Sequence, residues 1–520
     1  MLRLQEGNVN IVVFEDEITL YWDKQWELSD GVIYRIYLDG KNIATTDKTH
    51  YEITGLEADK AYAVAVEGHS GESVFCGTLR TEKIKKRIDV TKPPYNAVGD
   101  GKTVNTVSIQ KALDNCKSDE VIYFPNGIYM TGALDMKSNT ELRLEREAVI
   151  QGTGNVEDYA PKVLSRFEGR EMECYRPLIN IGKMDKNGGY TTENVVIRGG
   201  AVYGGGKELC WSVIDLEKER LKDFLKENAD YVKTCENENT IPGRARPRLI
   251  NMNNAKNVVF ANCNIGFGAA WNVHFVYCKD VLTYNCTIKS RGVWNGDGWN
   301  PDSSENCTIF GTRFDTHDDA IAIKSGKNPE GNVINRPTRG IRIFDCGGCN
   351  GVACGSELSG GISEVYIWDC DFDKGGGGFR VKSTRKRGGF VKNVKIRNCK
   401  LIDIRLWTGY TCNDDGEGAG VLTDIENFDI KNVEIHGVSY RPEQPIIEVV
   451  PIMIWGFDEP ERYIRNVTID GVRLPSSDDG LQRIEIKNAA NVSINNITYY
   501  EIERRVEGKF KKEYDFKFKK

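Results

Sequence analysis

A repeating hydrophobic pattern runs through the chain from about residue 190 to residue 500. Each repeat begins with a polar residue and continues as a short run of β-branched and other apolar residues, as in KNVVFANCNI, KDVLTYNCTI and KNVKIRNCKL. The residues that open the repeats are Asn194, Asn257, Asp280, Glu364, Asn393, Asn432, Asn466 and Asn491. Their shorter intervals, such as that from Asn257 to Asp280, match one turn of a solenoid. The pattern therefore predicts stacked strands, each turn burying its apolar face against the next.

A second regularity lies six residues after these polar positions. The residues found there are Cys263, Cys286, Cys370, Cys399, Val438, Val472 and Ile497. Equal depth in successive turns predicts one buried ladder of small apolar side chains. We therefore interpret these cysteines as buried packing residues and not as catalytic thiols.

Short strands that recur at this period predict an all-β fold, a right-handed parallel β-helix. Before the repeats, Ile109, Ala112, Leu113 and Cys116 share one face of a predicted helix, which would cover the open N-terminal end of the solenoid. The charged segment 215–239 interrupts the repeats and is predicted to be helical. It is either a solvated surface helix or a wall of the binding cleft.

The first 88 residues predict a separate small β-sandwich, because short strands such as EITLYWDK, IYRIYLDG and AYAVAVEG recur at roughly ten-residue spacing. Trp22 and the Leu56 to Tyr62 spacing resemble a fibronectin type III domain, although Ala58 stands where that family has proline. We interpret this domain as a spacer or packing module. The basic stretch RTEKIKKRIDVTKPP marks the linker, so the predicted domains are residues 1–88 and 89–520.

Composition narrows the function classes. The net charge of −6 gives no reason to expect nucleic acid as a partner. No run approaches the roughly 18 apolar residues of a membrane helix. The start MLRLQEGNVNIVVFEDE does not resemble a signal peptide, so we expect a cytoplasmic protein whose 15 cysteines are reduced. The CGGC segment at 346–349 has no second pair nearby, and no metal or other cofactor is expected.

Three carboxylates stand close together on glycine-rich loops. Asp297 lies in WNGDGWNPDSS, and Asp318 and Asp319 lie in THDDAIAIKSGKN, in consecutive turns of the predicted solenoid. Adjacent strands are about 4.8 Å apart, so the two loops should converge. Arg380 and Lys382 lie at a comparable depth in a later turn. Carboxylates that face cations across one groove suit hydrolysis of an acidic glycoside, which needs an acid, a base and a cation for the sugar carboxylate.

From residue 90 to 500 the sequence resembles glycoside hydrolase family 28, the polygalacturonase family. Asn295-Gly296-Asp297, His317-Asp318-Asp319 and Arg380-Val381-Lys382 match its Asn-x-Asp, Asp-Asp and Arg-Ile-Lys motifs. Further segments that resemble bacterial members in the same order are GDGKTVNTVSIQKALDNC, YFPNGIYMTGAL, RPRLI, WNVHFVYC, IAIKSGKN and GSELSGG.

The resemblance implies a role for each matched residue. Asp318 is the expected general acid, while Asp297 and Asp319 hold and deprotonate the attacking water. Arg380 and Lys382 bind the substrate. Asn295 and His274 are further expected substrate-binding residues.

One position departs from the family pattern. Cys349, in GCNGVACGSELSGG, occupies the place expected for the histidine of a Gly-His-Gly motif. A thiol cannot carry positive charge, so the neighbouring carboxylates lose a potential cationic partner, although Cys349 is still expected to be a substrate-binding residue. Either the activity is specialised through an altered subsite or the enzyme is disabled, and the surviving aspartates and basic residues favour specialisation.

The predicted function is an inverting, exo-acting hydrolase of short pectin-derived oligosaccharides or related plant glycosides. Hydrolysis of rhamnogalacturonan-type or other plant glycosides is an alternative. A polysaccharide lyase and a non-catalytic glycan-binding solenoid are two further alternatives, and the Asn-x-Asp, Asp-Asp and Arg-x-Lys set favours hydrolysis over both. The sequence leaves the glycan, endo or exo cleavage, and the oligomeric state open.

Overall fold

The computed structural model describes residues 2–6, 8–26, 31–185, 188–439, 446–476, 482–501 and 510–512. Its internal contacts divide the chain into two units, Met1–Arg87 and Ile88–Lys520. Among the described residues, no helix is both long and apolar enough to cross a lipid bilayer.

The N-terminal unit consists of two antiparallel sheets around one apolar core. The first sheet contains β1 (Leu2–Glu6), β2 (Val9–Val13), β3 (Glu17–Trp22) and β6 (His50–Thr54) in that order, and the second contains β5 (Lys41–Thr46), β4 (Tyr34–Leu38), β7 (Ala61–Glu67) and β8 (Ser73–Arg80). Alternate residues along the strands point inward, so that Trp22, Tyr34 and Val64 share the core. A β-sandwich is therefore present, as the sequence predicts.

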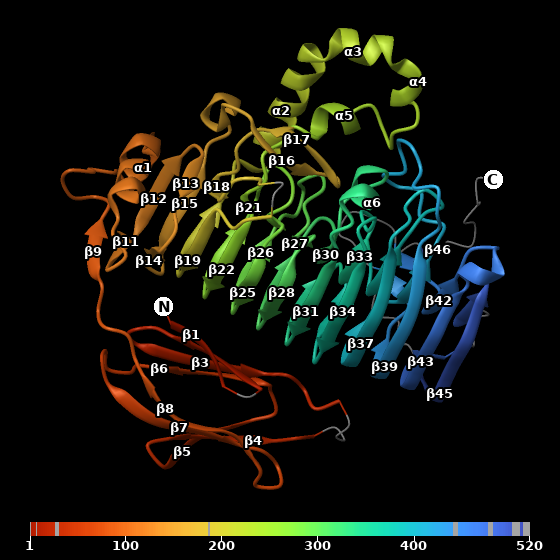
Figure 1. Ribbon diagram of the computed structural model, residues 1–520, viewed down its shortest axis with the longest axis horizontal. Helices are drawn as coiled ribbons and strands as arrows, with labels where there is room; N and C mark the ends of the chain where they lie inside the picture. Colours follow the sequence, from red (N-terminus) through yellow and green to blue (C-terminus); the bar gives the residue numbers. More distant parts are fainter. Residues whose placement is uncertain are drawn as a thin grey trace. The chain divides into compact units, whose positions relative to one another are not determined.

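The second unit is a parallel β-helix, in which three ladders of strands run along one elongated body (Figure 1). The first ladder contains β11 (Glu120–Phe124), β14 (Thr140–Leu144), β19 (Thr192–Arg198), β22 (Ala255–Ala261), β25 (Lys279–Tyr284), β28 (Glu305–Phe310), β31 (Thr338–Phe344), β34 (Ile362–Trp368), β37 (Phe390–Leu401), β39 (Asp424–Ile435), β43 (Ile464–Pro475) and β45 (Ala489–Tyr500). β9 (Lys86–Asp89) pairs with β11 at its start.

The second and third ladders complete each turn. The second contains β10 (Asp100–Val104), β12 (Gly127–Thr131), β15 (Ala148–Gly152), β20 (Ala201–Tyr203), β23 (Asn264–Gly266), β26 (Thr287–Lys289), β29 (Arg313–Asp315), β32 (Gly347–Cys349) and β35 (Asp371–Lys374). The third contains β13 (Leu134–Met136), β18 (Ile179–Ile181), β21 (Ile250–Asn253), β24 (Val273–Val276), β27 (Trp299–Asp302), β30 (Ile321–Ile323), β33 (Val352–Gly355), β36 (Phe379–Lys382), β38 (Ile404–Trp407), β42 (Ile452–Trp455) and β44 (Ile484–Lys487).

The polar residues that open the repeats have a structural reason. Asn257, for example, adopts the left-handed conformation with φ of 54°, which asparagine tolerates better than most residues. Its side-chain amide donates to Asn194 Oδ1 of the preceding turn at 2.7 Å. Asn491 donates to Asn466 Oδ1 in the same manner at 3.1 Å. Each polar residue therefore turns the chain and bonds to its neighbour in the stack.

The buried ladder predicted from the cysteines is present, with one error of register. Cys263 and Cys286 stack with their sulfurs 3.8 Å apart. Cys399, however, pairs with Val433 and not with the predicted Val438. The polar residue of that turn is accordingly Asn427, whose amide donates to Asn393 Oδ1 at 3.1 Å, and not the predicted Asn432. Both asparagines lie in one long strand, so the sequence pattern alone fits either register.

The helices and remaining strands lie at one end of the β-helix or outside its turns. α1 (Thr106–Asn115) buries Ile109, Ala112 and Leu113 against the first turns, as predicted. The charged segment folds into α2 (Gly206–Arg220), α3 (Lys222–Glu227), α4 (Ala229–Val232) and α5 (Thr240–Gly243). The other elements are a hairpin of β16 (Val163–Phe167) and β17 (Arg170–Cys174), α6 (Glu330–Ile334), two 3-10 turns (Val156–Tyr159, Pro460–Arg462), and the short strands β40 (Val438–Ser439), β41 (Ile446–Glu448) and β46 (Phe510–Lys512).

Candidate active site

One polar pocket lies along the third ladder, where the loops that flank β24 to β38 meet the hairpin and the helical segment. The residues that line it are Glu168, Glu236, Trp271, Asn295, Asp297, Asp318, Asp319, Lys324, Gly355, Ser356, Glu357, Lys382, Tyr410, Cys412 and Asn413. Six of these are carboxylic acids and two are lysines. All three aspartates singled out in the sequence are among them.

The aspartates converge because they precede neighbouring strands. Asp297 comes just before β27 and Asp319 just before β30, and these strands are paired. Gly298 makes the close approach possible: a Cβ at this position would lie 2.4 Å from the Ala320 carbonyl oxygen. The Gly298 N–H donates to the Asp319 carbonyl oxygen at 3.0 Å, which locks the two loops together. The glycines of WNGDGW therefore bring the two carboxylate-bearing loops together.

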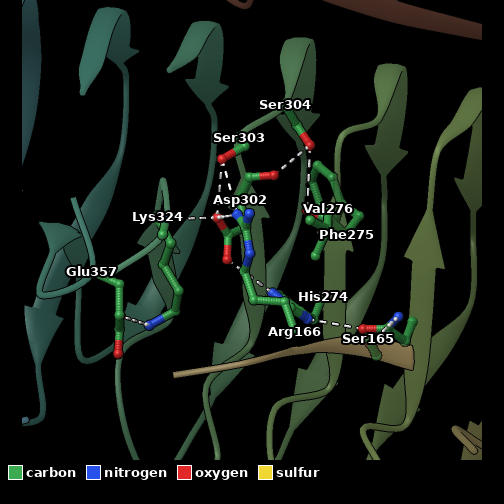
Figure 2. Close-up of polar contacts among 12 residues, drawn as sticks. Ser165, Arg166, His274, Phe275, Val276, Asp302, Ser303, Ser304, Lys324 and Glu357 are labelled. Carbon is green, nitrogen blue, oxygen red and sulfur yellow. Dashed lines mark hydrogen bonds and ion pairs between the residues drawn. The ribbon is translucent and has the colours of Figure 1, made fainter. Parts of the chain in front are cut away.

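Two buried lysines hold the carboxylates. Lys382 Nζ lies 2.8 and 2.6 Å from the two carboxylate oxygens of Asp319. Lys324 Nζ lies 2.9 Å from Glu357 Oε2 and 3.5 Å from Asp297 Oδ2, and Figure 2 shows it extended toward Glu357. The same ammonium group lies 4.5 Å from the centre of the Trp271 ring. Each lysine is therefore committed to an acid of the pocket.

Burial and mutual repulsion favour proton uptake by the aspartates. Burial raises the pKa of Asp297 well above its usual value, and Asp318 and Asp319 raise it further, while Lys324 opposes the shift. Burial also raises the pKa of Asp319 despite the ion pair with Lys382. Burial acts to lower the pKa of Lys324, but Glu357 and Asp297 outweigh it and keep this lysine charged. Asp297 and Asp319 are thus stronger bases than exposed aspartates.

The other predicted binding residues fall into two groups. Asn295 lines the pocket, and its Oδ1 accepts a hydrogen bond from Arg246 at 2.6 Å. Arg380 does not line it. The Arg380 guanidinium donates to Asp403 Oδ2 and to the Gly376 carbonyl oxygen, both at 2.6 Å, with 21% of the side chain exposed. Of the predicted Arg and Lys pair, Lys382 therefore lies nearer the carboxylates.

His274, predicted to bind substrate, is not among the pocket residues, although its ring packs edge-on against the pocket residue Trp271. It is fully buried, with Nδ1 2.8 Å from Asn251 Oδ1 and Nε2 3.4 Å from Asp302 Oδ2. Burial lowers its pKa to about 4, so the ring is neutral at physiological pH. Figure 2 shows it beside Asp302, which also accepts from Arg166 Nη1 at 2.7 Å. In β24 the neighbours Val273 and Phe275 point into the core, so His274 points to the outer face of the ladder, where it meets Asp302, a partner of Arg166 in the hairpin.

Cys349 lies beneath the loop that carries Asp318 and is not among the pocket residues. Its sulfur is 3.5 Å from the Phe314 carbonyl oxygen and 3.8 Å from that of Thr316. Arg291 approaches the same sulfur at 3.7 Å. Burial raises the pKa of this thiol. Cys349 therefore contacts the backbone that leads to Asp318 and the carboxylate of Asp315, which lies outside the pocket.

Several pocket residues were not singled out from the sequence. Lys324 and Glu357 stand inside the segments IAIKSGKN and GSELSGG, just after β30 and β33, so the ends of these strands were the available signal. Trp271 precedes β24 and stacks on Phe167 of the hairpin with ring centres 4.7 Å apart. Glu168 and Glu236 come from outside the repeats, where no periodic pattern points to them.

A buried ion-pair network joins the three segments that border the pocket on its outer side. Asp415, in the loop after β38, accepts hydrogen bonds from Arg244 Nη2 at 2.9 Å, from Arg170 Nη2 at 3.0 Å and from Lys327 Nζ. Arg244 Nε donates in turn to Glu168 Oε2 at 2.7 Å. Hairpin, helical segment and late loop are thereby tied together. We call these three joined segments, residues 163–174, 206–244 and 408–423, the roof.

Asp415→Asn should loosen the roof, because the buried carboxylate balances three cations, of which, among the described residues, only Arg244 keeps a second carboxylate, that of Glu168. The expected loss of unfolding free energy is about 3 kcal/mol or more. The matched control is Glu219→Gln, which breaks an exposed 3.4 Å pair with Lys222 and should change stability by less than about 1 kcal/mol. Thermal unfolding and hydrogen exchange in residues 206–244 measure both.

The same network has a defined pH dependence. Burial acts to raise the pKa of Asp415, but Arg244 and Lys327 outweigh it and hold the pKa well below its usual value. A depressed carboxyl pKa stabilises the fold above the unfolded value of about 4 and loses this effect as pH falls further. A roof equally protected from exchange in the Asp415→Asn protein would contradict its role.

A family model and two curated relatives point to the same protein family. Residues 189–444 match the model for glycosyl hydrolases family 28. An exo-poly-alpha-D-galacturonosidase of Dickeya chrysanthemi is 25% identical over 95% of this chain and 90% of its own length. A probable polygalacturonase of Vitis vinifera is 28% identical over 67% of this chain and 66% of its own length.

Solved structures agree on the fold. A family 28 exopolygalacturonase of Yersinia enterocolitica superposes with a TM-score of 0.72 at 20% identity and covers 98% of both chains. A hyperthermoactive exopolygalacturonase of Thermotoga maritima gives a TM-score of 0.62 at 23% identity, over 80% of this chain and 92% of its own.

Proposed function

We propose that this chain is a glycoside hydrolase of family 28 that releases a terminal sugar from short galacturonate-containing oligosaccharides. The observation that carries the proposal is the meeting of three aspartates and two lysines in one pocket that the roof borders. The relative from Dickeya chrysanthemi, named as an exo-poly-alpha-D-galacturonosidase, supports the same reaction type. The pocket supplies both an acid and a base, which glycoside hydrolysis requires.

The chemistry assigned to the pocket uses its carboxyls in two roles. Asp318 gives its proton to the glycosidic oxygen, which leaves with the bonding electron pair. A water molecule held by Asp297 and Asp319 attacks the anomeric carbon and loses a proton to this pair. The raised pKa of both aspartates suits them to accept that proton. Lys382 and Arg380 provide positive charge on the side of Asp319 for a sugar carboxylate.

The exo character rests on the roof. Glu168 at the hairpin turn, Glu236 in the helical segment and Cys412 in the late loop all line the pocket, and none of them belongs to the β-helix ladders. The Asp415 network ties these segments together. A pocket closed on one side accepts the end of a chain, whereas internal cleavage needs a groove open at both ends.

The test of exo action uses an end-labelled trigalacturonate and polymeric polygalacturonate. The first product from the trisaccharide should be a monosaccharide from one defined end, and reducing ends should appear from the polymer before its viscosity falls. A sharp fall in viscosity with few new reducing ends would indicate internal cleavage and contradict the proposal.

We also expect hydrolysis to invert the anomeric configuration. Asp297 and Asp319 hold water on the side of the sugar opposite the acid, which requires roughly 6.5 to 9.5 Å between acid and base carboxyls. Proton NMR of the first turnover should therefore show the β-anomer of the released sugar from an α-linked substrate. A product that retains the α configuration would assign a nucleophile to the pocket instead.

The N-terminal unit is proposed to be fibronectin type III-like. Tyr62 supports this, because its hydroxyl accepts a hydrogen bond from the Glu57 N–H at 2.8 Å and so forms a tyrosine corner. The four-stranded sheet in the order β5, β4, β7, β8 agrees with this family.

A further inference from the structure

Glu236 stands out among the acids of the pocket. Four of the six acids lie beside a cation: Glu168 beside Arg244, Asp319 beside Lys382, and Glu357 and Asp297 beside Lys324. In the part of the chain that the structure describes, no ion pair joins Glu236 or Asp318 to a cation. Asp318 is the proposed acid of the reaction. Glu236 has no role in that chemistry, yet it lines the same pocket.

The charged neighbours of Glu236 in the pocket are the acids Glu168 and Asp318. Glu236 lies between α4 and α5 of the roof, and the thiol of Cys412 is its hydrogen-bonding partner. Partial burial raises the pKa of Glu236, and the charges of Glu168 and Asp318 add to the rise, while the hydrogen bond with Cys412 opposes it. The shortest contacts of Lys382 go to Asp319 and not to Glu236. The part of the pocket beside Glu236 thus has uncompensated negative charge.

A negatively charged pocket wall discriminates between sugars. A uronate carboxylate placed beside Glu236 would put a second anion next to a carboxylate that has no cation partner among the described residues. The hydroxyl groups of an uncharged sugar would instead donate hydrogen bonds to the Glu236 carboxylate, which are stronger than bonds between neutral groups. The same carboxylate therefore favours one class of sugar and disfavours the other.

We propose that Glu236 is a specificity-determining residue that selects an uncharged sugar at the roof side of the pocket and rejects a uronate there. The proposal rests on the proposed function and deepens it. The substrate class is then a mixed oligosaccharide, in which a uronate lies toward Lys382 and Arg380 and a neutral sugar lies beside Glu236. Such a mixed oligosaccharide differs from a chain that consists of galacturonates alone.

The experiment compares three trisaccharides: trigalacturonate, and two analogues in which the first or the last sugar has a primary alcohol in place of the carboxylate. We expect one analogue to exceed trigalacturonate in kcat/KM by at least tenfold at pH 7. Glu236→Gln should bring this ratio near one, chiefly by improving trigalacturonate. Glu238→Gln is the matched control, because Glu238 lies two residues away with 79% of its side chain exposed and pairs with Lys218, and it should leave the ratio unchanged.

Each result decides the proposal. A ratio at or below one for both analogues, or a Glu236→Gln protein in which all three substrates change equally, would overturn it. If no trisaccharide is hydrolysed, the proposed function fails, and the selection by Glu236 is then read as the same ratio of dissociation constants by calorimetry. A ratio that Glu236→Gln does not change in binding would overturn the inference there as well.

Discussion

Replacing Asp318 by Asn should lower kcat by about a hundredfold to ten-thousandfold while leaving substrate binding nearly unchanged. The amide has the shape of the acid but cannot give a proton to the leaving oxygen, and general acid catalysis is worth a factor of this size. Asp318 also has no ion pair to lose among the described residues. Initial rates on an oligogalacturonide, calorimetric binding and thermal unfolding together separate loss of chemistry from loss of structure.

The matched control for this variant is Asp315→Asn. Asp315 ends β29 three residues before Asp318, but 47% of its side chain is exposed and its ion-pair partner is Arg291 outside the pocket. Turnover of the control protein should stay within a few-fold of normal. Near-normal turnover by Asp318→Asn would show that another carboxyl of the pocket donates the proton, and Asp297→Asn and Asp319→Asn would then identify it.

The β-helix was predictable because each structural turn requires the same residue types at the same positions, so the sequence repeats with the turns. Each turn needs a residue that tolerates positive φ, and Asn194, Asn257 and Asn466 mark these places. The error at Asn432 has the same origin. Two asparagines in one long strand, both with positive φ, offer two registers of equal quality, and only the pairing of Cys399 with Val433 decides between them.

The acid residues of the site were predictable and much of their support was not. Asp297, Asp318 and Asp319 occur at turns between strands, so their convergence follows from strand pairing. His274 lies in the strand itself and points to the outer face, but Trp271 and Asp302 pack against it there and keep it out of the pocket lining. The commitment of Arg380 to Asp403 depends on a contact between adjacent turns that no spacing reveals.

The roof lies beyond prediction from periodicity for a different reason. Its residues come from three segments far apart in the sequence, and Asp415 joins them through Arg170, Arg244 and Lys327. The charged pattern of residues 215–239 predicts a helix but not what the helix borders. Irregular segments are placed by tertiary contacts, so their functional residues, Glu236 among them, become visible only in the folded chain.

Replacing Lys324 by Met should lower kcat/KM at least tenfold at neutral pH and move the acid limb of its pH profile upward by about one unit or more. Lys324 lies 3.5 Å from Asp297 and opposes the rise in its pKa. Without this cation, the repulsion from Asp318 and Asp319 is opposed mainly by Lys382, which is bonded to Asp319. The pKa of Asp297 therefore rises further. The base must be deprotonated to act, and activity is therefore lost at a higher pH on acidification.

Two further variants separate this electrostatic role from a loss of folding. Lys324→Arg keeps the charge and should leave the acid limb near its normal position. Glu357→Gln removes the acid that competes for Lys324 at 2.9 Å and should move the acid limb to lower pH, opposite to Lys324→Met. The lysine is buried, so the Met variant should also lose about 3 kcal/mol or more of stability, but a smaller folded fraction lowers the whole profile without displacing it. Acid limbs that shift in the same direction in Lys324→Met and Glu357→Gln would show that Lys324 does not set the protonation of Asp297.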